Sequence, residues 1–444
     1  MLNFIRSFYL RKWFFRSLLF IGLLFLVAHW FEEWYNIAWL FVFVFILLFI
    51  ADLLLVFVPQ NPIKATRVLP EKFSNSDSNP VPVSVFNKYG FKIHISIIDE
   101  LPVQFQKRDF FYSGKIEKHK SHNFEYHLRP VERGIYQFGA LHIFISSPLQ
   151  LVARRFSFQK EQEVAVYPSF IQMKKYDFLA ISNKLTAFGF KKIRRIGHTM
   201  EFEQIKNYVK GDDYRTINWK ATAKHSTLMV NQYQDEKAQP ILSMIDTGRV
   251  MKMPFEGLKL LDYAINATLA FSNVALKKKD KVGMLSFNKK VSDYVMPSDK
   301  LSNLSSIMER LYGIDTQYPD ADFGLLYNFL KRKVSHRSLL MLYTNFEHIS
   351  ALKRQLPYLQ AIARKHLLVV IFFENTELKK ITEQDAEDLQ GIYHKTIAEK
   401  FDFDKRVMQK ELQKHGIQSI LTTPEKLSIN AINKYLEIKS RGLL

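Results

Sequence analysis

The sequence contains no cysteine among its 444 residues. Disulfide bonds, cysteine metal sites and cysteine nucleophiles are therefore excluded. The chain also lacks a glycine-rich phosphate loop, a Gly-x-Ser-x-Gly elbow and a His-Glu-x-x-His motif. Because these patterns are missing, the sequence predicts no catalytic residue and no cofactor-binding residue, and we expect a protein that is not an enzyme.

Charge is nearly missing from two long apolar runs close to the N-terminus. They cover Ser17–Trp30 and Ile37–Val58, and the second alone exceeds the ~20 residues that cross a bilayer core. A cleavable signal peptide is the alternative. No small-residue cleavage site follows the first run, however, and a second run comes at once. Residues 1–60 are therefore predicted to form a transmembrane helical hairpin.

Basic residues flank this hairpin at both ends, whereas the turn between the two runs, FEEWYN, is acidic. The flanking residues are Arg6, Arg11, Lys12, Arg16, Lys64 and Arg67. Because positive charge stays on the cytoplasmic side, both ends of the hairpin are predicted to be cytoplasmic. We expect a multi-pass protein of the inner (plasma) membrane, with the bulk of the chain in the cytoplasm.

The net charge of +20 raises the question of a nucleic-acid partner. Basic clusters occur at 191–195, 277–279 and 331–337. No helix-turn-helix, zinc-finger or aromatic RNA-binding pattern accompanies them. A domain held beneath an anionic leaflet gains from basic residues that face it. We therefore expect the lipid bilayer, and not nucleic acid, as the partner of this charge.

Two patterns of hydrophobicity divide the rest of the chain. In residues 61–170 apolar and polar residues alternate, as in VPVSVFN and FKIHISIID, which predicts a small β-sandwich. Residues 240–444 instead alternate wholly apolar strands with helical segments. This pattern predicts a doubly wound α/β domain with a parallel sheet covered on both faces. Residues 171–239 link the two domains.

Particular elements of the α/β domain follow from the same pattern. An apolar strand, ILSMID, ends in Asp246, and functional groups gather at the carboxyl ends of such strands. Helical spacing predicts a helix from Phe255 to Lys278 and a long helix near Ala398–Lys414.

The segment GHTMEFEQIKNYVKGDDYRTINWKATAKHSTLMVNQY (Gly197–Tyr233), with the strand that ends in Asp246, resembles the core of the domain-of-unknown-function-58 family. RGIYQFG and SPLQLV are similar to that family's β-region. The resemblance covers the whole chain and implies a C-terminal von Willebrand factor A-like domain. Members of the family are membrane-anchored proteins, often encoded beside MoxR-type AAA+ ATPases. The resemblance therefore implies such an ATPase as partner and an adaptor role in envelope-associated assembly or stress functions.

A von Willebrand factor A-like domain also implies a divalent-metal site at Asp246. The usual ligands are a serine-containing turn, a threonine and a second carboxylate. Here the turn reads Asp-Thr-Gly-Arg-Val, and Thr344 and Asn345 stand where the second carboxylate would be. One carboxylate, an amide and the nearby Arg249 guanidinium form a poor cation cage. We therefore predict that Asp246, Thr344 and Asn345 hold no metal and that Asp246 caps the segment after its strand.

The stretch GDDYRTINW within the family segment is the candidate interaction site. Gly211 permits a tight turn, Asp212 can cap it or pair with a base, and Arg215 can bind a carboxylate with two hydrogen bonds. Trp219 is expected to be a half-buried anchor. The segment is predicted to clamp the two domains together or to form one rim of a partner groove.

An enzyme is the alternative function. Its site would lie between this segment and the α/β sheet and would use Asp212, Asp213 and His225. Convergence of these side chains with Asp246 in one pocket would favour the enzyme. Pairing of Asp212 or Arg215 within the segment would favour the interaction protein.

Overall fold

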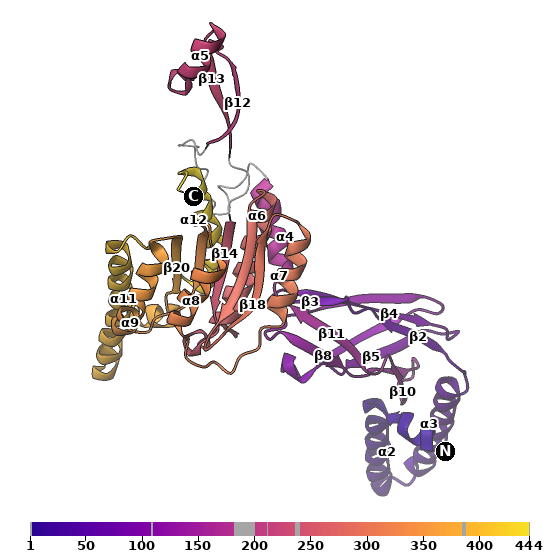
Figure 1. The fold of residues 1–444 in the computed structure, drawn as a ribbon. Coiled ribbons are helices and arrows are strands. Elements are labelled where there is room, and N and C mark those ends of the chain that lie inside the picture. The colour runs from indigo at the N-terminus through magenta and orange to yellow at the C-terminus, as the bar shows by residue number, and fades with distance from the viewer. Residues whose placement is uncertain are drawn as a thin grey trace. The chain divides into compact units, whose positions relative to one another are not determined.

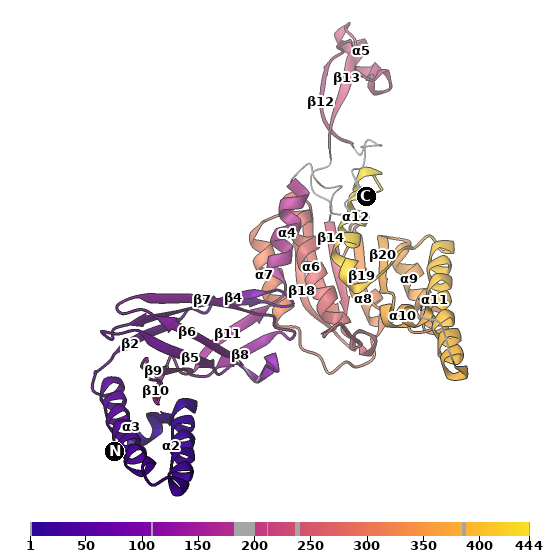
Figure 2. The ribbon, with the colours of Figure 1, turned by 180° about the vertical axis from the view of Figure 1, so that it is seen from behind.

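The computed structural model describes residues 2–107, 110–181, 200–210, 212–235, 240–383 and 388–443. The chain forms two compact units, Met1–Tyr167 and Pro168–Leu444 (Figures 1 and 2). The basic cluster at 191–195 and the start of the family segment lie outside the described residues. The two units are described one after the other.

After α1 (Leu2–Ser7) and a short strand, the first unit has two apolar helices, α2 (Lys12–Trp30) and α3 (Trp34–Phe57). They are 19 and 24 residues long, and their most apolar windows have mean hydropathies of 1.7 and 3.1. Only 11% of each window is buried, so most of these apolar side chains are exposed. By length and composition both helices can cross a bilayer.

Both ends of this helix pair join strands of the first unit, in two different sheets. Before α2, β1 (Phe8–Leu10) pairs antiparallel with β10 (Val152–Phe158). After α3, β2 (Ile63–Arg67) enters the sheet formed with β4 (Asn79–Asn87). Residues on the two outer ends of the helix pair therefore lie on one side of any membrane that the pair crosses.

Polar contacts fix the last turns of α3 to β10. The buried Asp52 accepts hydrogen bonds from the backbone N–H groups of Leu151 and Val152, both at 2.9 Å. The Arg154 guanidinium donates to the carbonyls of Val56 and Phe57, at 3.3 and 3.2 Å. The final carbonyls of a helix have no partner within the helix, so Arg154 supplies one and holds α3 against the strand.

The strands of the first unit form three sheets, and residues from two of them share one apolar core. Ile63 of β2 and Val83 of β4 pack with Ile95 of β5 and Ile143 of β9. Every strand pair is antiparallel except β3 with β11. The strand orders are β1-β10-β9-β5-β6, β2-β4-β7 and β3-β11-β8. The remaining bounds are β3 (Lys72–Ser74), β5 (Ile93–Asp99), β6 (Phe111–Ile116), β7 (Ser121–Leu128), β8 (Gly134–Phe138), β9 (Leu141–Ser146) and β11 (Gln162–Tyr167).

A six-stranded sheet forms the centre of the second unit, in the order β18-β17-β14-β19-β20-β21. All its neighbouring strands are parallel except β18, which pairs antiparallel with β17 at one edge. The chain starts in the middle at β14, adds β17 and β18 on one side, and then adds β19, β20 and β21 on the other. The bounds are β14 (Pro240–Asp246), β17 (Lys281–Phe287), β18 (Val291–Ser298), β19 (Leu339–Tyr343), β20 (Leu367–Phe373) and β21 (Gln418–Thr422).

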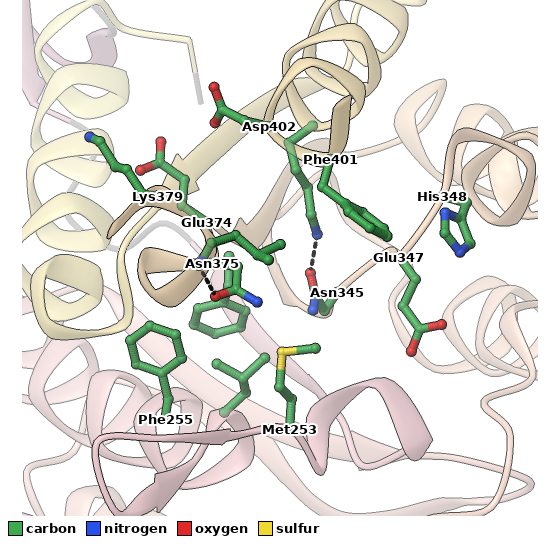
Figure 3. Close-up of a pocket in the computed structure, with 14 residues that line it drawn as sticks. Met253, Phe255, Asn345, Glu347, His348, Glu374, Asn375, Lys379, Phe401 and Asp402 are labelled. Carbon is green, nitrogen blue, oxygen red and sulfur yellow. Dashed lines mark hydrogen bonds between the residues drawn. The ribbon is translucent and has the colours of Figure 1, made fainter. Parts of the chain in front are cut away.

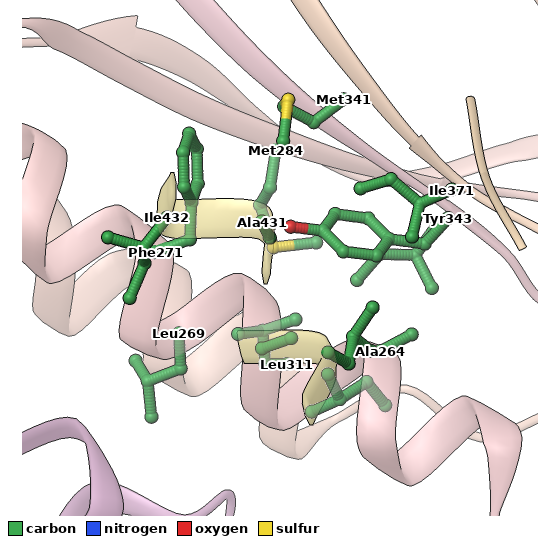
Figure 4. Close-up of a cluster of buried hydrophobic side chains, with 14 of the residues drawn as sticks. Ala264, Leu269, Phe271, Met284, Leu311, Met341, Tyr343, Ile371, Ala431 and Ile432 are labelled. Atoms are coloured by element: carbon green, nitrogen blue, oxygen red, sulfur yellow. The ribbon is translucent and has the colours of Figure 1, made fainter. Parts of the chain in front are cut away.

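Helices cover both faces of this sheet because its strands are apolar on both faces. Within β14, Ile241 and Ile245 join one core cluster, whereas Leu242 and Met244 join the other. Alternate residues of a strand point to opposite faces, so each face needs its own cover. Figure 4 shows part of the first cluster, where Phe271 lies beside Ile432 and Tyr343 beside Ile371. The covering helices are α4 (Phe170–Ile181), α6 (Leu260–Lys277), α7 (Ser302–Tyr312) and α12 (Leu427–Ser440) on that face, and α8 (Phe323–Lys333), α9 (Ile349–Ala363) and α11 (Leu389–Lys414) on the other.

Two helix starts differ from the sequence prediction. The helix expected from Phe255 begins at Leu260, because Glu256 and Gly257 adopt positive φ angles of 46° and 84° in a tight turn between β15 (Pro254–Phe255) and β16 (Leu258–Lys259). The helix expected near Ala398 begins at Leu389. There Asp388 accepts a hydrogen bond from the Gly391 N–H at 2.6 Å and caps the first turn.

Gly283 lets β18 approach β17 closely. A Cβ atom at this position would lie 2.5 Å from the Val295 carbonyl oxygen and 2.7 Å from the Pro297 nitrogen. We expect Gly283→Ala to destabilise the second unit by about 1–3 kcal/mol through overpacking, measured as a lower melting temperature. Gly313→Ala is the control, because its nearest atom would be 3.6 Å away. Equal melting temperatures for the two variants would contradict this account.

Candidate functional site

The carboxyl ends of β14 and β19 meet where the strand order of the sheet reverses. The chain leaves β14 towards β17 on one side and returns on the other side at β19. Such a switch point leaves a crevice outside the strand ends, where open α/β sheets bind ligands. Asp246 is the last residue of β14, and Thr344 directly follows β19.

Asp246 is 1% exposed, and both of its carboxylate oxygens have protein donors. The Thr344 hydroxyl donates to Oδ2 at 2.6 Å, and the Gly248 N–H donates to Oδ1 at 2.7 Å. A Cβ atom on Gly248 would lie 2.8 Å from Oδ1 and 3.1 Å from the Pro319 carbonyl oxygen, so this turn requires glycine. The bond to Gly248 holds the turn directly after β14, whereas the 3₁₀ turn that follows, Arg249–Met251, has no side-chain cap.

Burial also changes the acidity of this carboxyl group. Desolvation raises the pKa of Asp246 to about 6, although the hydrogen bonds from Thr344 and Gly248 oppose the shift. At neutral pH the group is therefore mostly ionised. Its surroundings nevertheless favour the protonated form more than water does.

Asn345, the third residue of the candidate metal set, contacts a lysine. Its Oδ1 accepts a hydrogen bond from Lys405 Nζ at 2.7 Å, and Lys405 also donates to the Phe346 carbonyl at 2.6 Å. The amide oxygen that a cation would use is thus held by an ammonium group. Arg249 lines the same cavity as Asp246. Among the residues that the structure describes, no group of three or more histidine and acidic side chains is placed to hold a metal.

The role of Lys405 at the carboxyl ends of the strands was not predicted from the sequence. Only 9% of the residue is exposed, and burial lowers its pKa to about 8, while Glu347 raises it. It comes from α11, 60 residues after its partner Asn345. A signal was present: Ala398, Lys405, Met408 and Leu412 are the buried residues of α11, so the lysine lies on a stripe of helical spacing.

Two cavities open beside the carboxyl ends of the strands, and both are lined by Asn345, Glu347 and His348. The first, of about 380 Å³, is polar and is lined by Asp246, Thr344, Arg249 and Arg354. The second, of about 270 Å³, is mostly apolar and contains Lys405. Figure 3 shows the second cavity, with Asn345 between Met253 and Phe401.

The family segment forms a two-stranded hairpin of β12 (Met200–Asn207) and β13 (Met229–Asp235). Its connection contains a 3₁₀ turn, η3 (Tyr214–Thr216), and a short helix, α5 (Trp219–His225). We call residues 208–228 the hairpin tip. Gly211, predicted to permit a turn here, lies outside the described residues.

The acids of the tip are engaged within the hairpin. Asp212 accepts from the Val209 N–H and from Lys206 Nζ, both at 3.0 Å, and these contacts lower the pKa of Asp212. Asp213 caps η3 by accepting from the Arg215 N–H at 3.0 Å. His225 is exposed at the last position of α5. Each acid therefore holds a turn.

Trp219 is more exposed than the sequence predicted. It is 70% exposed, so the expectation of a half-buried anchor is wrong. The residue opens α5, where Asn218 caps the helix by accepting from the Ala221 N–H at 3.0 Å. A two-stranded hairpin has too little apolar surface to bury an indole. Arg215 is exposed too, with its guanidinium 5.7 Å from the ring centre of Tyr214.

The sequence from β12 to the first turn of α11 matches a known family. Residues 204–391 match the family model described as "Protein of unknown function DUF58". The predicted resemblance to this family is confirmed. A curated relative, "Uncharacterized protein YeaD" of Bacillus subtilis (strain 168), is 22% identical over 260 residues, which are 57% of this chain. The chain spans 63% of the length of that relative.

Solved structures give weaker likenesses. The conserved hypothetical protein BatB from Bacteroides thetaiotaomicron is 14% identical, with 46% of this chain and 100% of that chain covered, at a TM-score of 0.29. The PapD-like domain 7 of human CEP192 is 9% identical, with 24% of this chain and 85% of that chain covered, at a TM-score of 0.18. TM-scores of this size do not establish a shared fold.

The raised pKa of Asp246 predicts a pH-dependent effect of Asp246→Asn. A carboxyl group whose pKa is raised by folding favours the folded state below about pH 4, and this contribution is lost as pH rises through about 6. We expect Asp246→Asn to gain stability relative to the natural protein over this window. The gain should reach at most about 3 kcal/mol at pH 7.

Calorimetric melting of the second unit from pH 4 to pH 8 measures this difference. Asp299→Asn, at an exposed position, is the control and should show no such slope. A difference between Asp246→Asn and the natural protein that stays constant across the range would contradict the assignment.

Proposed function

We propose that this protein is a membrane-anchored interaction protein, without enzymatic activity, that binds its partner through the hairpin tip. One observation carries the proposal. Within the family-matched region, Val209, Tyr214 and Trp219 are 62%, 69% and 70% exposed on one small tip. Exposed apolar and aromatic clusters of this kind mark interaction sites. Tryptophan, tyrosine and arginine dominate the binding energy of interfaces.

The charge of the tip favours an acidic partner surface. Lys210, Arg215, Lys220 and Lys224 are exposed on it, whereas Asp212 is engaged by Lys206. Complementary charge raises the rate of encounter and selects partners. From the family resemblance we infer that the partner is a MoxR-type AAA+ ATPase. The process served is an envelope-associated assembly or stress function.

The anchor is the pair α2 and α3 in the inner (plasma) membrane, with both units in the cytoplasm. Their length and apolar exposure support this role, and the pairing of β1 with β10 supports a common side for both ends. The basic flanks support a cytoplasmic location for that side.

The finer fold assignments belong to the same proposal. A parallel sheet whose first strand ends in Asp246, with Thr344 donating to it, supports a von Willebrand factor A-like second unit. The core shared by β2, β4, β5 and β9 supports a β-sandwich in the first unit.

The contacts of the tip also bear on the enzyme alternative. An acid–base site would need Asp212, Asp213 or His225 in contact with a reacting group. Asp212 and Asp213 instead accept hydrogen bonds that hold the turns of the tip. These contacts support a structural role for both acids and a recognition role for the exposed side chains beside them.

Labelling of single cysteines tests the anchor, since the natural chain has none. Glu32 lies in the turn between α2 and α3, Arg6 precedes the pair, and Lys64 follows it, all exposed. In intact cells we expect an impermeant thiol reagent to label Glu32→Cys and to spare Arg6→Cys and Lys64→Cys. All three should react after the cells are permeabilised. Labelling of Arg6→Cys or Lys64→Cys in intact cells would overturn the proposed orientation.

Capture of the ATPase tests the tip. We expect Arg215→Ala and Trp219→Ala each to weaken binding of the purified full chain to its MoxR-type ATPase by about tenfold or more. Tyr393→Ala removes an equally exposed aromatic residue from α11 and should leave binding unchanged. Unaltered capture by both tip variants, with circular dichroism unchanged, would overturn the proposal.

A further inference from the structure

The apolar cavity beside the carboxyl ends of the strands contains a buried ammonium group whose two hydrogen-bond acceptors are both neutral. Lys405 Nζ donates to the Asn345 amide oxygen and to the Phe346 carbonyl oxygen. An ammonium group has three N–H donors, so one remains for another acceptor. Among the residues that the structure describes, no carboxylate forms an ion pair with this lysine. The buried ammonium thus has no hydrogen-bonded counter-charge, and Glu347, which lines the same cavity, acts on it through its charge without forming an ion pair.

Burying such a charge raises the free energy of the folded state unless an opposite charge pairs with it. Moving an ammonium group out of water costs several kcal/mol, and neutral oxygens recover only part of that. Burial lowers the Lys405 pKa only to about 8, so the group is still charged at neutral pH. Lys405 lines the cavity of about 270 Å³. A ligand in that cavity can therefore reach the lysine without a change of fold.

The walls of the cavity require an apolar ligand body. They are formed by Met253, Phe255, Leu260, Phe373, Leu378 and Phe401. In Figure 3, Phe255 and Met253 face the cavity from one side and Phe401 from the other. Apolar pockets with a few placed polar groups are typical of small-ligand sites. The volume suits a ligand the size of one aromatic ring with a short chain.

The rim of the cavity limits the charge of the ligand. Glu347, Glu374 and Asp402 line it, together with Lys379 and His348. Asp402 pairs with Arg406 at 2.6 Å, whereas Glu347 is exposed. These acids repel a ligand with several negative charges, such as a nucleotide. A single carboxylate can be matched by the single lysine.

We propose that this cavity binds a monocarboxylate with an apolar body, with its carboxylate on Lys405 and its body between Phe255 and Phe401. The same chemistry is offered by a free aryl or alkyl acid and by the C-terminus of a peptide that ends in an apolar residue. The site is distinct from the hairpin tip, so its test is independent of partner capture.

Calorimetric titration of the full chain in lipid nanodiscs tests the site. The probes are 3-phenylpropionate and its uncharged amide, which has the same shape. We expect saturable binding of the acid and at least about tenfold weaker binding of the amide, because a charge-assisted hydrogen bond is lost. Lys405→Met should lose this preference, whereas Lys410→Met, an exposed lysine of the same helix, should keep it.

A second variant separates charge from packing. Phe401→Ala should weaken the acid and the amide alike, because it removes a wall and leaves the ammonium in place. A role of Lys405 in folding alone would not change the ratio between acid and amide. Absence of saturable binding of the acid up to about 10 mM, or an unchanged ratio in a folded Lys405→Met variant, would overturn the proposal.

Two peptides identify the source of the ligand. Gly-Gly-Phe with a free C-terminus is compared with its C-terminal amide. Binding of the free peptide as tightly as 3-phenylpropionate would assign the cavity to a chain terminus. Binding of 3-phenylpropionate alone would assign it to a free small acid.

Discussion

A parallel sheet covered on both faces offers polar chemistry only at its strand ends, and the second unit is arranged around this constraint. Alternate residues of β14 enter opposite cores, and before Asp246 the strand has only one polar side chain, the buried Ser243. Its end carries Asp246, and the next strand in the sheet ends beside Thr344. The adjacent Asn345 binds Lys405. Two consecutive residues after β19 therefore hold a buried acid and a buried base at one edge.

Most strands and helices could be predicted from the sequence, because the spacing of apolar residues along the chain follows which side chains are buried. The alternation in β4 and β5 and the apolar run of β20 are found as strands. The start of α6 could not be predicted, because the apolar spacing continues through Phe255 while the backbone turns at Glu256 with a positive φ. Glutamate carries no signal for that conformation, which in most proteins belongs to glycine.

The candidate site was predictable only where it depends on strand ends. Asp246 and Thr344 end neighbouring apolar runs, so their proximity follows from parallel pairing. Lys405 reaches this edge from a helix 60 residues later, and a lysine is ordinarily assigned to the surface. The prediction for Trp219 was wrong in the opposite direction, because this residue was expected to be half-buried and is exposed. Its size suggested burial, but burial requires a second layer of structure, and the hairpin that carries it is two strands wide.

The two proposed sites use positive charge in different physical ways. Arg215 and its neighbours on the hairpin tip are exposed. At physiological ionic strength, salt therefore largely screens their attraction to acidic groups that are more than about 8 Å away. Such charge governs how fast a partner is met and matters less for how long it stays. Lys405 is buried over the ring of Phe372 and donates to neutral oxygens. There the lower dielectric strengthens the attraction to one carboxylate and shields it from salt. The exposed cations therefore suit the recruitment of a large acidic surface, whereas the buried one suits retention of a small ligand.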